Sequence, residues 1–285
     1  MTQYYVLKIL ESLLIHLSKR LCYLLASILG ALAFGAVPFL RRNVTGNISH
    51  VLKPEDYNGK LNKTVRGVLT STIRNYVDLV TLPHQNHDDI IRSVNVTGLA
   101  HLDEAMSKGK GAILCTAHLG CFDAAFQIFS TYPTQMTVVV EPINPPILLN
   151  YVTRIRKNLG INILPAVTGA LRKIIKLLRN GEILLFALDR DTAGARVQSH
   201  FFGKETSMPA EALKIAMRTG AAIVPVFNNR RPDGNYNLYI EPEIDIIRNG
   251  NDSLEQNMER MARVLEKYIS MFPEQWVVLE PIWEN

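Results

Sequence analysis

The sequence predicts an α/β fold: a single domain with a central, mostly parallel mixed sheet flanked by helices, preceded by an N-terminal helical membrane-associating segment. From about residue 111 onward, short β-branched and apolar runs alternate with helical stretches, as in parallel sheets with crossover helices. The first 80 or so residues look helical and contain an uncharged apolar run. We therefore expect an N-terminal hydrophobic segment, residues 1–45, followed by the α/β domain, residues 46–285.

The apolar run, residues 21–40, reads LCYLLASILGALAFGAVPFL and is about as long as the roughly 20 residues that span a bilayer. It could span the membrane, lie in the membrane interface or pack on the domain. Ser27, the small residues and Pro38 weaken the spanning interpretation, and basic residues at both ends give no orientation signal. We favour a helix in the interface or in a hydrophobic groove. A cleaved signal peptide does not fit, because the run starts late and no small-residue cleavage site follows it.

The α/β domain is expected to contain six strands and five helices from residue 111 onward. The strands are GAILCTA (111–117), MTVVVE (136–141), INILP (161–165), EILLFAL (182–188), AAIVPVF (221–227) and YNLYIE (236–241). The helices lie near 122–130, 146–159, 168–179, 209–219 and 253–272. Proline and glycine support these bounds: Pro209 suits a helix start, and Gly160 and Gly220 suit helix ends. The segment NDSLEQ suits the start of the last helix.

Composition narrows the classes of protein that this chain can be. With 285 residues and 47% hydrophobic content, it can bury a full core without disulfides or metals. Its three cysteines, Cys22, Cys115 and Cys121, form no CxxC pair, so a reducing compartment fits better than a disulfide framework or a zinc site. The net charge of +5 favours an anionic membrane surface, a phosphorylated substrate or nucleic acid. Because RNP, zinc-finger and basic-zipper signatures are missing from the sequence, we expect no nucleic acid partner.

The chemical candidate is the stretch His118-Leu-Gly-Cys-Phe-Asp123, which follows the first predicted strand directly. On a regular helix this spacing would put His118 and Asp123 about 140° apart. They can meet only if His118 lies in the turn before the helix and Asp123 in its first turn, with Gly120 allowing the bend. Asp123 would then orient the imidazole and leave its other nitrogen as a base. Free N–H groups near Gly120 would stabilise an oxyanion.

A base of this kind needs a nucleophile to activate. The sequence has no serine in a GxSxG elbow, and Cys121 is conceivable but not favoured. The nucleophile is therefore expected to arrive with the substrate, as an alcohol that His118 deprotonates. The competing structural interpretation is that His118 caps a helix and Asp123 stabilises its first turn, and the bare spacing does not choose between the two.

The motif itself and three further stretches favour the chemical interpretation. HLGCFD after an apolar strand resembles the HxxxxD/E motif of glycerolipid and lipid A acyltransferases. The other stretches are LDRDTAG (188–194), FFGKETSMPAEALKIAMRTGAAIVPVF (201–227) and FPEQWVVLEPIW (272–283). Together they resemble blocks of the lipid A biosynthesis lauroyl/myristoyl acyltransferase family, within the lysophospholipid acyltransferase-like superfamily. The resemblance runs from about residue 40 to the end.

One stretch resembles a particular branch of that family. VVVEPINPPILLNYVTRIRKNLG (138–160) places Glu141 after the second predicted strand and Arg156 four residues before Gly160. This arrangement is more similar to the phosphatidylinositol mannoside acyltransferases than to the enterobacterial lipid A enzymes. Asp123 agrees, since the lipid A enzymes mostly carry glutamate at that position.

The resemblance implies roles for individual residues. His118 would be the catalytic base and Asp123 its orienting partner, while Glu141 and Arg156 would line the active-site groove. For Arg156 the alternative is a solvated helix residue. The remaining substrate-binding candidates are Gly120, Asp189, Arg190 and Asp191, which would lie near the site. The last three could instead form a local salt-bridged turn. Phe202 and Met208 could line an acyl channel or belong to the plain core.

The implied function is a membrane-associated O-acyltransferase at the cytoplasmic face of the cell inner membrane. It would move a fatty acyl chain from acyl-CoA or acyl carrier protein to a hydroxyl of a glycolipid or phospholipid, with no metal or bound cofactor. Two alternatives remain: a lipid ester hydrolase that uses the same dyad, and a catalytically idle lipid-binding protein. The intact pair argues against the idle protein. The sequence leaves open the acceptor, the chain length and the carrier of the donor.

Overall fold

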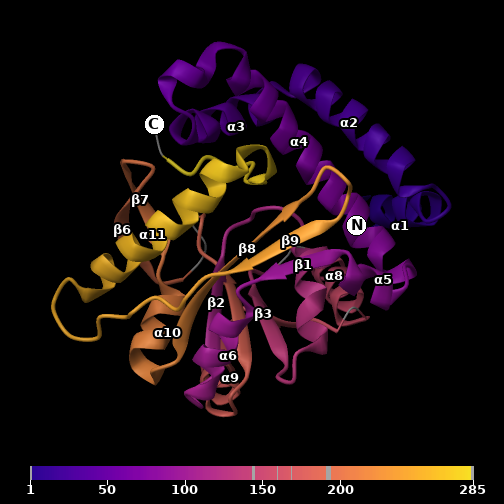
Figure 1. The fold of residues 1–285 in the computed structure, drawn as a ribbon. Coiled ribbons are helices and arrows are strands. Elements are labelled where there is room, and N and C mark those ends of the chain that lie inside the picture. Colours follow the sequence, from indigo (N-terminus) through magenta and orange to yellow (C-terminus); the bar gives the residue numbers. More distant parts are fainter. Residues whose placement is uncertain (1, 143–144, 159, 168, 191–193, 284–285) are drawn as a thin grey trace.

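The computed structural model describes residues 2–142, 145–158, 160–167, 169–190 and 194–283. Figure 1 shows the N-terminal helices, in indigo and purple, arching over one side of an α/β domain, with the N-terminus beside α1 and the C-terminus beside α3. These helices are α1 (Thr2–Leu14), α2 (Lys19–Ala36), α3 (Pro38–Val51) and α4 (Tyr57–Thr81). The prediction of a helical N-terminal region is therefore confirmed.

The apolar run 21–40 is divided between two helices. α2 ends at Ala36 and Pro38 begins α3, because a proline fits the first turn of a helix but cannot continue one. α2 lies along α4, and a Cβ at Gly30 would come within 2.9 Å of the Thr70 Cα. The proposed boundary at residue 45 falls inside α3, and the division into two segments there stays a prediction.

The described residues form one seven-stranded sheet in the order β1-β9-β8-β2-β5-β3-β4. Its strands are β1 (Val94–Thr97), β2 (Ala112–Thr116), β3 (Met136–Val140), β4 (Asn162–Pro165), β5 (Ile183–Ala187), β8 (Ala222–Arg230) and β9 (Tyr236–Ile240). Every neighbouring pair is parallel except β8 and β9. The predicted α/β fold with a mostly parallel mixed sheet is confirmed.

Helices cover both faces of this sheet. One face packs against α9 (Ala170–Arg179), α10 (Glu211–Thr219) and α11 (Ser253–Met271), and the other against α6 (Leu99–Ser107), α7 (Phe122–Ala125) and α8 (Pro146–Asn158). Alternate residues of β2 enter the two cores, with Ile113 and Cys115 in one and Ala112 and Leu114 in the other. The short helix α5 (His87–Arg92) precedes β1. A strand buried on both faces reads as a continuous apolar run, which is why β2 was predictable.

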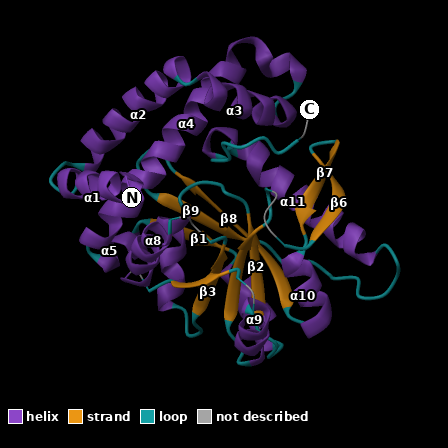
Figure 2. Ribbon diagram, turned by 180° about the vertical axis from the view of Figure 1, so that it is seen from behind, coloured by secondary structure: helices purple, strands orange, loops and turns teal. Residues whose placement is uncertain are grey.

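Three strands lie outside the predicted set. β1 is a four-residue edge strand, and β6 (Arg196–Phe201) pairs with β7 (Lys204–Pro209) as a separate antiparallel hairpin beside α11 (Figure 2). Pro209 ends β7 rather than starting a helix, and α10 begins at Glu211. The helix expected near 122–130 is the four-residue α7 followed by a 3-10 helix, Phe126–Thr131.

Candidate active site

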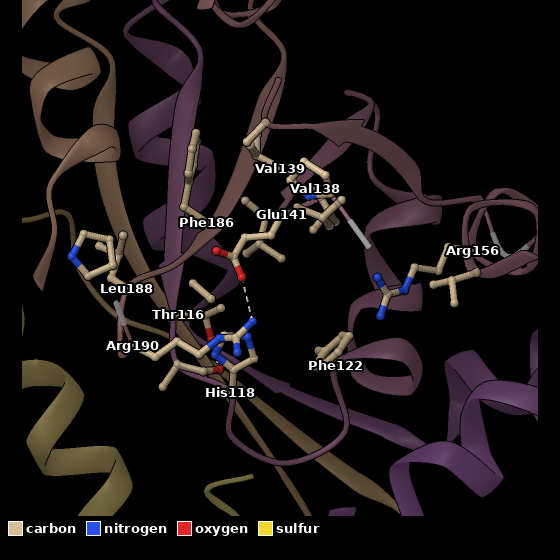
Figure 3. A pocket seen from close by; sticks show the side chains of 18 of the residues that line it. Thr116, His118, Phe122, Val138, Val139, Glu141, Arg156, Phe186, Leu188 and Arg190 are labelled. Atoms are coloured by element: carbon tan, nitrogen blue, oxygen red, sulfur yellow. Dashed lines mark hydrogen bonds and ion pairs between the residues drawn. The ribbon is translucent and has the colours of Figure 1, made fainter. Parts of the chain in front are cut away.

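His118 lies just beyond the carboxyl end of β2, the central strand between β5 and β8. Its ring borders a cavity of about 770 Å³ at this edge of the sheet. Open parallel sheets bind ligands in such a position, where loops from neighbouring strands separate. Figure 3 shows Phe122 and Arg156 on one side of the cavity, and Phe186, Leu188 and Arg190 on the other. The expectation that His118 sits in the turn before a helix agrees with this structure, since α7 begins four residues later.

The carboxylate that holds the His118 ring is Asp189, not Asp123. His118 Nδ1 lies 2.8 Å from Asp189 Oδ1, and the His118 amide donates to Asp189 Oδ2 at 2.9 Å. The strand register explains this correction. Thr116 of β2 pairs with Ala187 of β5, so the residues two positions beyond each strand meet at the same edge.

The surroundings of Asp189 favour its ionised form. It is only 2% exposed, and its Oδ2 also accepts the indole N–H of Trp276 at 2.7 Å. Burial alone would raise the pKa of Asp189, but the charge of His118 and the hydrogen bonds from His118 and Trp276 hold the pKa below its ordinary value. Because a carboxylate only accepts, His118 must carry its proton on Nδ1. Nε2 is then free to act as a base.

Asp123 is occupied by a different partner, the Arg156 guanidinium. Arg156 Nε lies 2.6 Å from Asp123 Oδ1, and Nη2 lies 3.2 Å from Oδ2, which is a two-point ion pair. The guanidinium also lies 5.0 Å from the centre of the Phe122 ring. The Arg156 side chain is 12% exposed, so the alternative of a solvated helix residue is wrong. Both residues border the cavity and join α7 to the carboxyl end of α8.

Arg190 and Glu141 meet near His118 at the rim of the cavity. Arg190 Nη2 donates to Glu141 Oε2 at 2.9 Å, the contact drawn as a dashed line in Figure 3. Arg190 Nη1 lies 3.4 Å from Glu280 Oε2, on the C-terminal segment. Sequence reasoning therefore located two groove residues and missed Glu280. Asp191 lies outside the described residues.

The turn after His118 is fixed by buried side chains that sequence reasoning missed. Asn228 Oδ1 accepts from the Cys121 amide at 2.7 Å, and its Nδ2 donates to the Leu119 carbonyl at 3.0 Å. The Gly120 amide donates to the Gln275 carbonyl at 3.0 Å. The Gly120 amide is therefore already paired, and the expectation that N–H groups near Gly120 stabilise an oxyanion stays a prediction. Gly120 has φ +67°, and a Cβ there would lie 2.4 Å from the Asn228 carbonyl oxygen, so close packing on β8 requires glycine.

Phe202 and Met208 do not border the cavity. Phe202 lies in the turn between β6 and β7, where its ring packs against Trp276 and Trp283. Met208 is buried in the core on the α11 face. The structural alternative is therefore the correct one for both. Apolar walls of the cavity come instead from β3, β5 and α9: Val138, Val139, Leu185, Phe186, Ala170, Leu171 and Ile174.

α4 also borders the cavity, through Thr72, Asn75, Tyr76 and Leu79. The lining of the cavity thus combines apolar side chains of the sheet and α9 with polar side chains that include His118 and those of α4. Such a site can hold a long hydrocarbon chain with its reactive end beside His118. Within the described residues, no group of three or more His, Cys, Asp or Glu side chains is placed to hold a metal ion.

Comparisons with known proteins agree with the motif resemblance. The model of the family described as bacterial lipid A biosynthesis acyltransferase matches residues 1–285. The phosphatidylinositol mannoside acyltransferase of Mycolicibacterium smegmatis is 31% identical over 224 residues, which cover 77% of this chain and 72% of that relative. The lipid A biosynthesis lauroyltransferase of Escherichia coli is 28% identical over 196 residues, which cover 67% of this chain and 61% of that relative.

Proposed function

Because the chain belongs to the bacterial lipid A biosynthesis acyltransferase family, and is thus an acyltransferase, we propose that it transfers a fatty acyl chain from a thioester to a hydroxyl of a glycolipid at a membrane. The observation that carries this proposal is the His118–Asp189 pair at the wall of the apolar cavity. One similar protein takes its name from phosphatidylinositol mannoside, which supports a glycolipid acceptor. Phospholipid remains the alternative acceptor.

In the proposed reaction, His118 Nε2 removes the proton from the acceptor hydroxyl, and the oxygen attacks the thioester carbonyl. Asp189 stays ionised and stabilises the imidazolium that forms. Collapse of the tetrahedral intermediate breaks the carbon–sulfur bond. The leaving thiolate then takes the proton from His118, which returns the base to its starting state.

Charge along the chain supports an anionic donor. Residues 142–181 contain seven Arg and Lys residues and no Asp or Glu. This segment includes α8 and α9, which both border the cavity. Acyl-CoA and acyl carrier protein both present phosphate next to the thioester arm, and cations on helices that border the cavity would attract either one. The carrier of the acyl chain remains open between these two donors.

The first prediction concerns the reaction itself. With a labelled acyl thioester and an extracted glycolipid fraction, we expect label in a lipid ester and release of one thiol per ester formed. Omitting the acceptor should stop most thiol release, because the hydroxyl is the nucleophile. Mass spectrometry of the lipid products and a thiol assay make the two measurements. Free fatty acid as the main product, with or without acceptor, would instead establish the lipid ester hydrolase.

We further propose that α1 and α2 lie along the membrane surface on the cytoplasmic side. Of the described helices, α2 is one long and apolar enough to span a bilayer. Its inner face, Cys22, Ala26 and Gly30, is nevertheless buried against the domain. Its outer face exposes Leu24, Leu29 and Leu32, each by more than half. A helix with one face packed and one apolar face exposed suits the membrane interface.

The second prediction tests this placement. Changing Leu24, Leu29 and Leu32 together to glutamine should lower the fraction bound to anionic vesicles in a flotation assay. Each leucine contributes on the order of 1 kcal/mol when its exposed part enters the apolar layer, so we expect at least a ~10-fold weaker partition. Thermal unfolding should change little, because these side chains touch solvent.

Leu99→Gln is the matched control, since Leu99 is an exposed leucine on α6, remote from α2. It should leave vesicle binding unchanged. Alkaline carbonate should release the wild-type chain from membranes if α2 lies in the interface. Retention in the pellet after carbonate would overturn the interfacial placement in favour of a spanning helix.

A further inference from the structure

A polar network with a buried Asp78–Arg230 pair and the half-buried Tyr23 and Asn75 contacts the turn that carries His118. Asn75 of α4 donates its Nδ2–H to the Gly120 carbonyl at 2.7 Å, and its Oδ1 accepts from Arg230 Nη2 at 2.9 Å. Because a guanidinium only donates, it fixes which end of the Asn75 amide faces Gly120. The position of the Gly120 carbonyl therefore depends on where Arg230 is held.

Arg230, the last residue of β8, is held by Asp78 of α4. Its Nη2 lies 2.5 Å from Asp78 Oδ2, and the two side chains are 4% and 1% exposed. Burial alone would lower the pKa of Arg230, but the charge of Asp78, together with the nearby Cys121, Tyr23 and Tyr236, holds the pKa well above its ordinary value. Buried ion pairs add little net stability on average, because desolvation offsets their attraction. What this pair supplies at its place in the fold is a fixed geometry for the Arg230 guanidinium.

Tyr23 of α2 completes the network. Its hydroxyl lies 2.7 Å and 2.9 Å from the two carboxylate oxygens of Asp78, and it accepts from Arg230 Nε at 3.1 Å. Burial, followed by the charge of Asp78, raises the pKa of Tyr23, so the phenol stays a neutral donor. Tyr236 and Cys121 also donate to Asp78 Oδ2. Tyr23 thus connects the network to α2, the helix whose outer face is proposed to contact the membrane.

We propose that Tyr23, Asp78, Arg230 and Asn75 are positioning residues for the His118 turn, so that α2 supports the active site as well as the membrane contact. Tyr23, Asp78 and Arg230 do not border the cavity, so they act through Asn75 and the Gly120 carbonyl, and through the Cys121 thiol that donates to Asp78. This inference rests on the proposed role of His118. It predicts that small changes in the network lower kcat in protein that is fully folded.

Two conservative variants test the proposal. Tyr23→Phe removes only the hydroxyl that bridges Asp78 and Arg230. Asn75→Asp keeps an acceptor for Arg230 but replaces the donor to Gly120 with an oxygen that repels its carbonyl. Misplacing a catalytic group by on the order of 1 Å costs about 100-fold, so we expect kcat to fall about 100-fold in Asn75→Asp and about 10-fold in Tyr23→Phe. In Tyr23→Phe the KM for the acyl donor should stay within about threefold, since Tyr23 does not border the cavity.

Matched controls separate positioning from stability. Tyr132→Phe removes a phenol that donates to the exposed Asp103 at 2.7 Å and does not border the cavity. In Asn257→Ala, a fully buried amide that bonds the backbone of Ile247 through both its ends is lost from α11. Both controls should lower the melting temperature without changing kcat. Steady-state kinetics in detergent micelles, melting curves and vesicle flotation are measured on all four variants.

The possible outcomes distinguish failure of the positioning proposal from failure of the proposed function on which it rests. Positioning is supported if Tyr23→Phe lowers kcat, keeps vesicle binding and melts no lower than Asn257→Ala. If Tyr23→Phe and Asn75→Asp both keep kcat within about twofold of the controls while His118→Ala is inactive, the network is only structural. If Asn75→Asp does not fold, the kcat of Tyr23→Phe decides alone. Full activity in His118→Ala would instead overturn the proposed function itself.

Discussion

We expect His118→Ala to abolish acyl transfer while leaving the fold intact. The imidazole is the proposed base, and general acid–base groups contribute on the order of 10²–10⁴ in rate. Loss of the ring removes one donor from Asp189, which keeps the His118 amide and the Trp276 indole as donors. The buried carboxylate therefore stays paired and the melting temperature should fall only slightly. Transfer is measured as labelled acyl chain that appears in lipid.

His87→Ala is the control for His118→Ala. The His87 ring is exposed, contacts Ser130 Oγ at 2.9 Å and does not border the cavity. Its removal should leave transfer within about twofold of the wild-type rate. If His118→Ala retained more than about a tenth of the wild-type kcat, His118 would not be the base, and another side chain of the cavity would have to activate the acceptor.

Much of the fold was predictable because its strands are short apolar runs bounded by turn residues. β2 is the clearest case, since all five of its residues are buried and its helical neighbours begin or end near glycine or proline. β1 was missed because a four-residue edge strand gives little pattern. The hairpin was missed although β6 alternates exposed and buried residues, RVQSHF, which is the two-residue period of a strand with one face packed.

The sequence predicted the catalytic base of the site, His118, but not the residues that bond to it. His118 followed from its place at the end of an apolar strand, whereas Asp189 depends on the order of strands in the sheet. β2 and β5 are neighbours although β3 and β4 lie between them in sequence, and no local pattern reveals that. Phe202 was misplaced for a related reason: apolar residues look alike whether they fill a core or border a cavity. Asn75, Asn228 and Gln275 are single polar residues whose role appears only with the turn in place.

The second large effect is expected from Asp189→Asn. Three donors converge on Asp189, two from His118 and one from Trp276, and an asparagine offers them only one oxygen. If its NH₂ group faces His118 Nδ1, the ring must carry its proton on Nε2 and can no longer act as a base. We expect kcat to fall by about 10²–10⁴. The effect on KM should be small, because Asp189 is buried behind His118.

The same carboxylate links stability to pH. The pKa of Asp189 is held below its ordinary value of 3.8 in the folded chain. A group with a depressed pKa contributes stability that is fully present above the unfolded value and is lost as the pH falls through the folded value. The wild-type chain should therefore lose this contribution below about pH 3.8. Asp189→Asn should melt lower at neutral pH and lose less of its melting temperature on acidification.

Asp123→Asn distinguishes the observed His118–Asp189 pair from the His118–Asp123 pair that the HxxxxD spacing suggests. It leaves the His118–Asp189 contact in place but removes the charge that pairs with Arg156, whose side chain is 12% exposed. Breaking a buried ion pair costs about 3–5 kcal/mol, and the remaining amide oxygen still accepts one hydrogen bond, so we expect a loss on the order of 2 kcal/mol in the free energy of unfolding. In protein that stays folded, the His118 tautomer is unchanged and kcat should fall far less than in Asp189→Asn. Unfolding curves give the stability of both variants, and kinetics measured below the lower of the two melting temperatures compare their kcat values. If Asp123→Asn lost as much kcat as Asp189→Asn at equal stability, Asp123 would act in the chemical step and the pairing with Arg156 would have to open during the reaction.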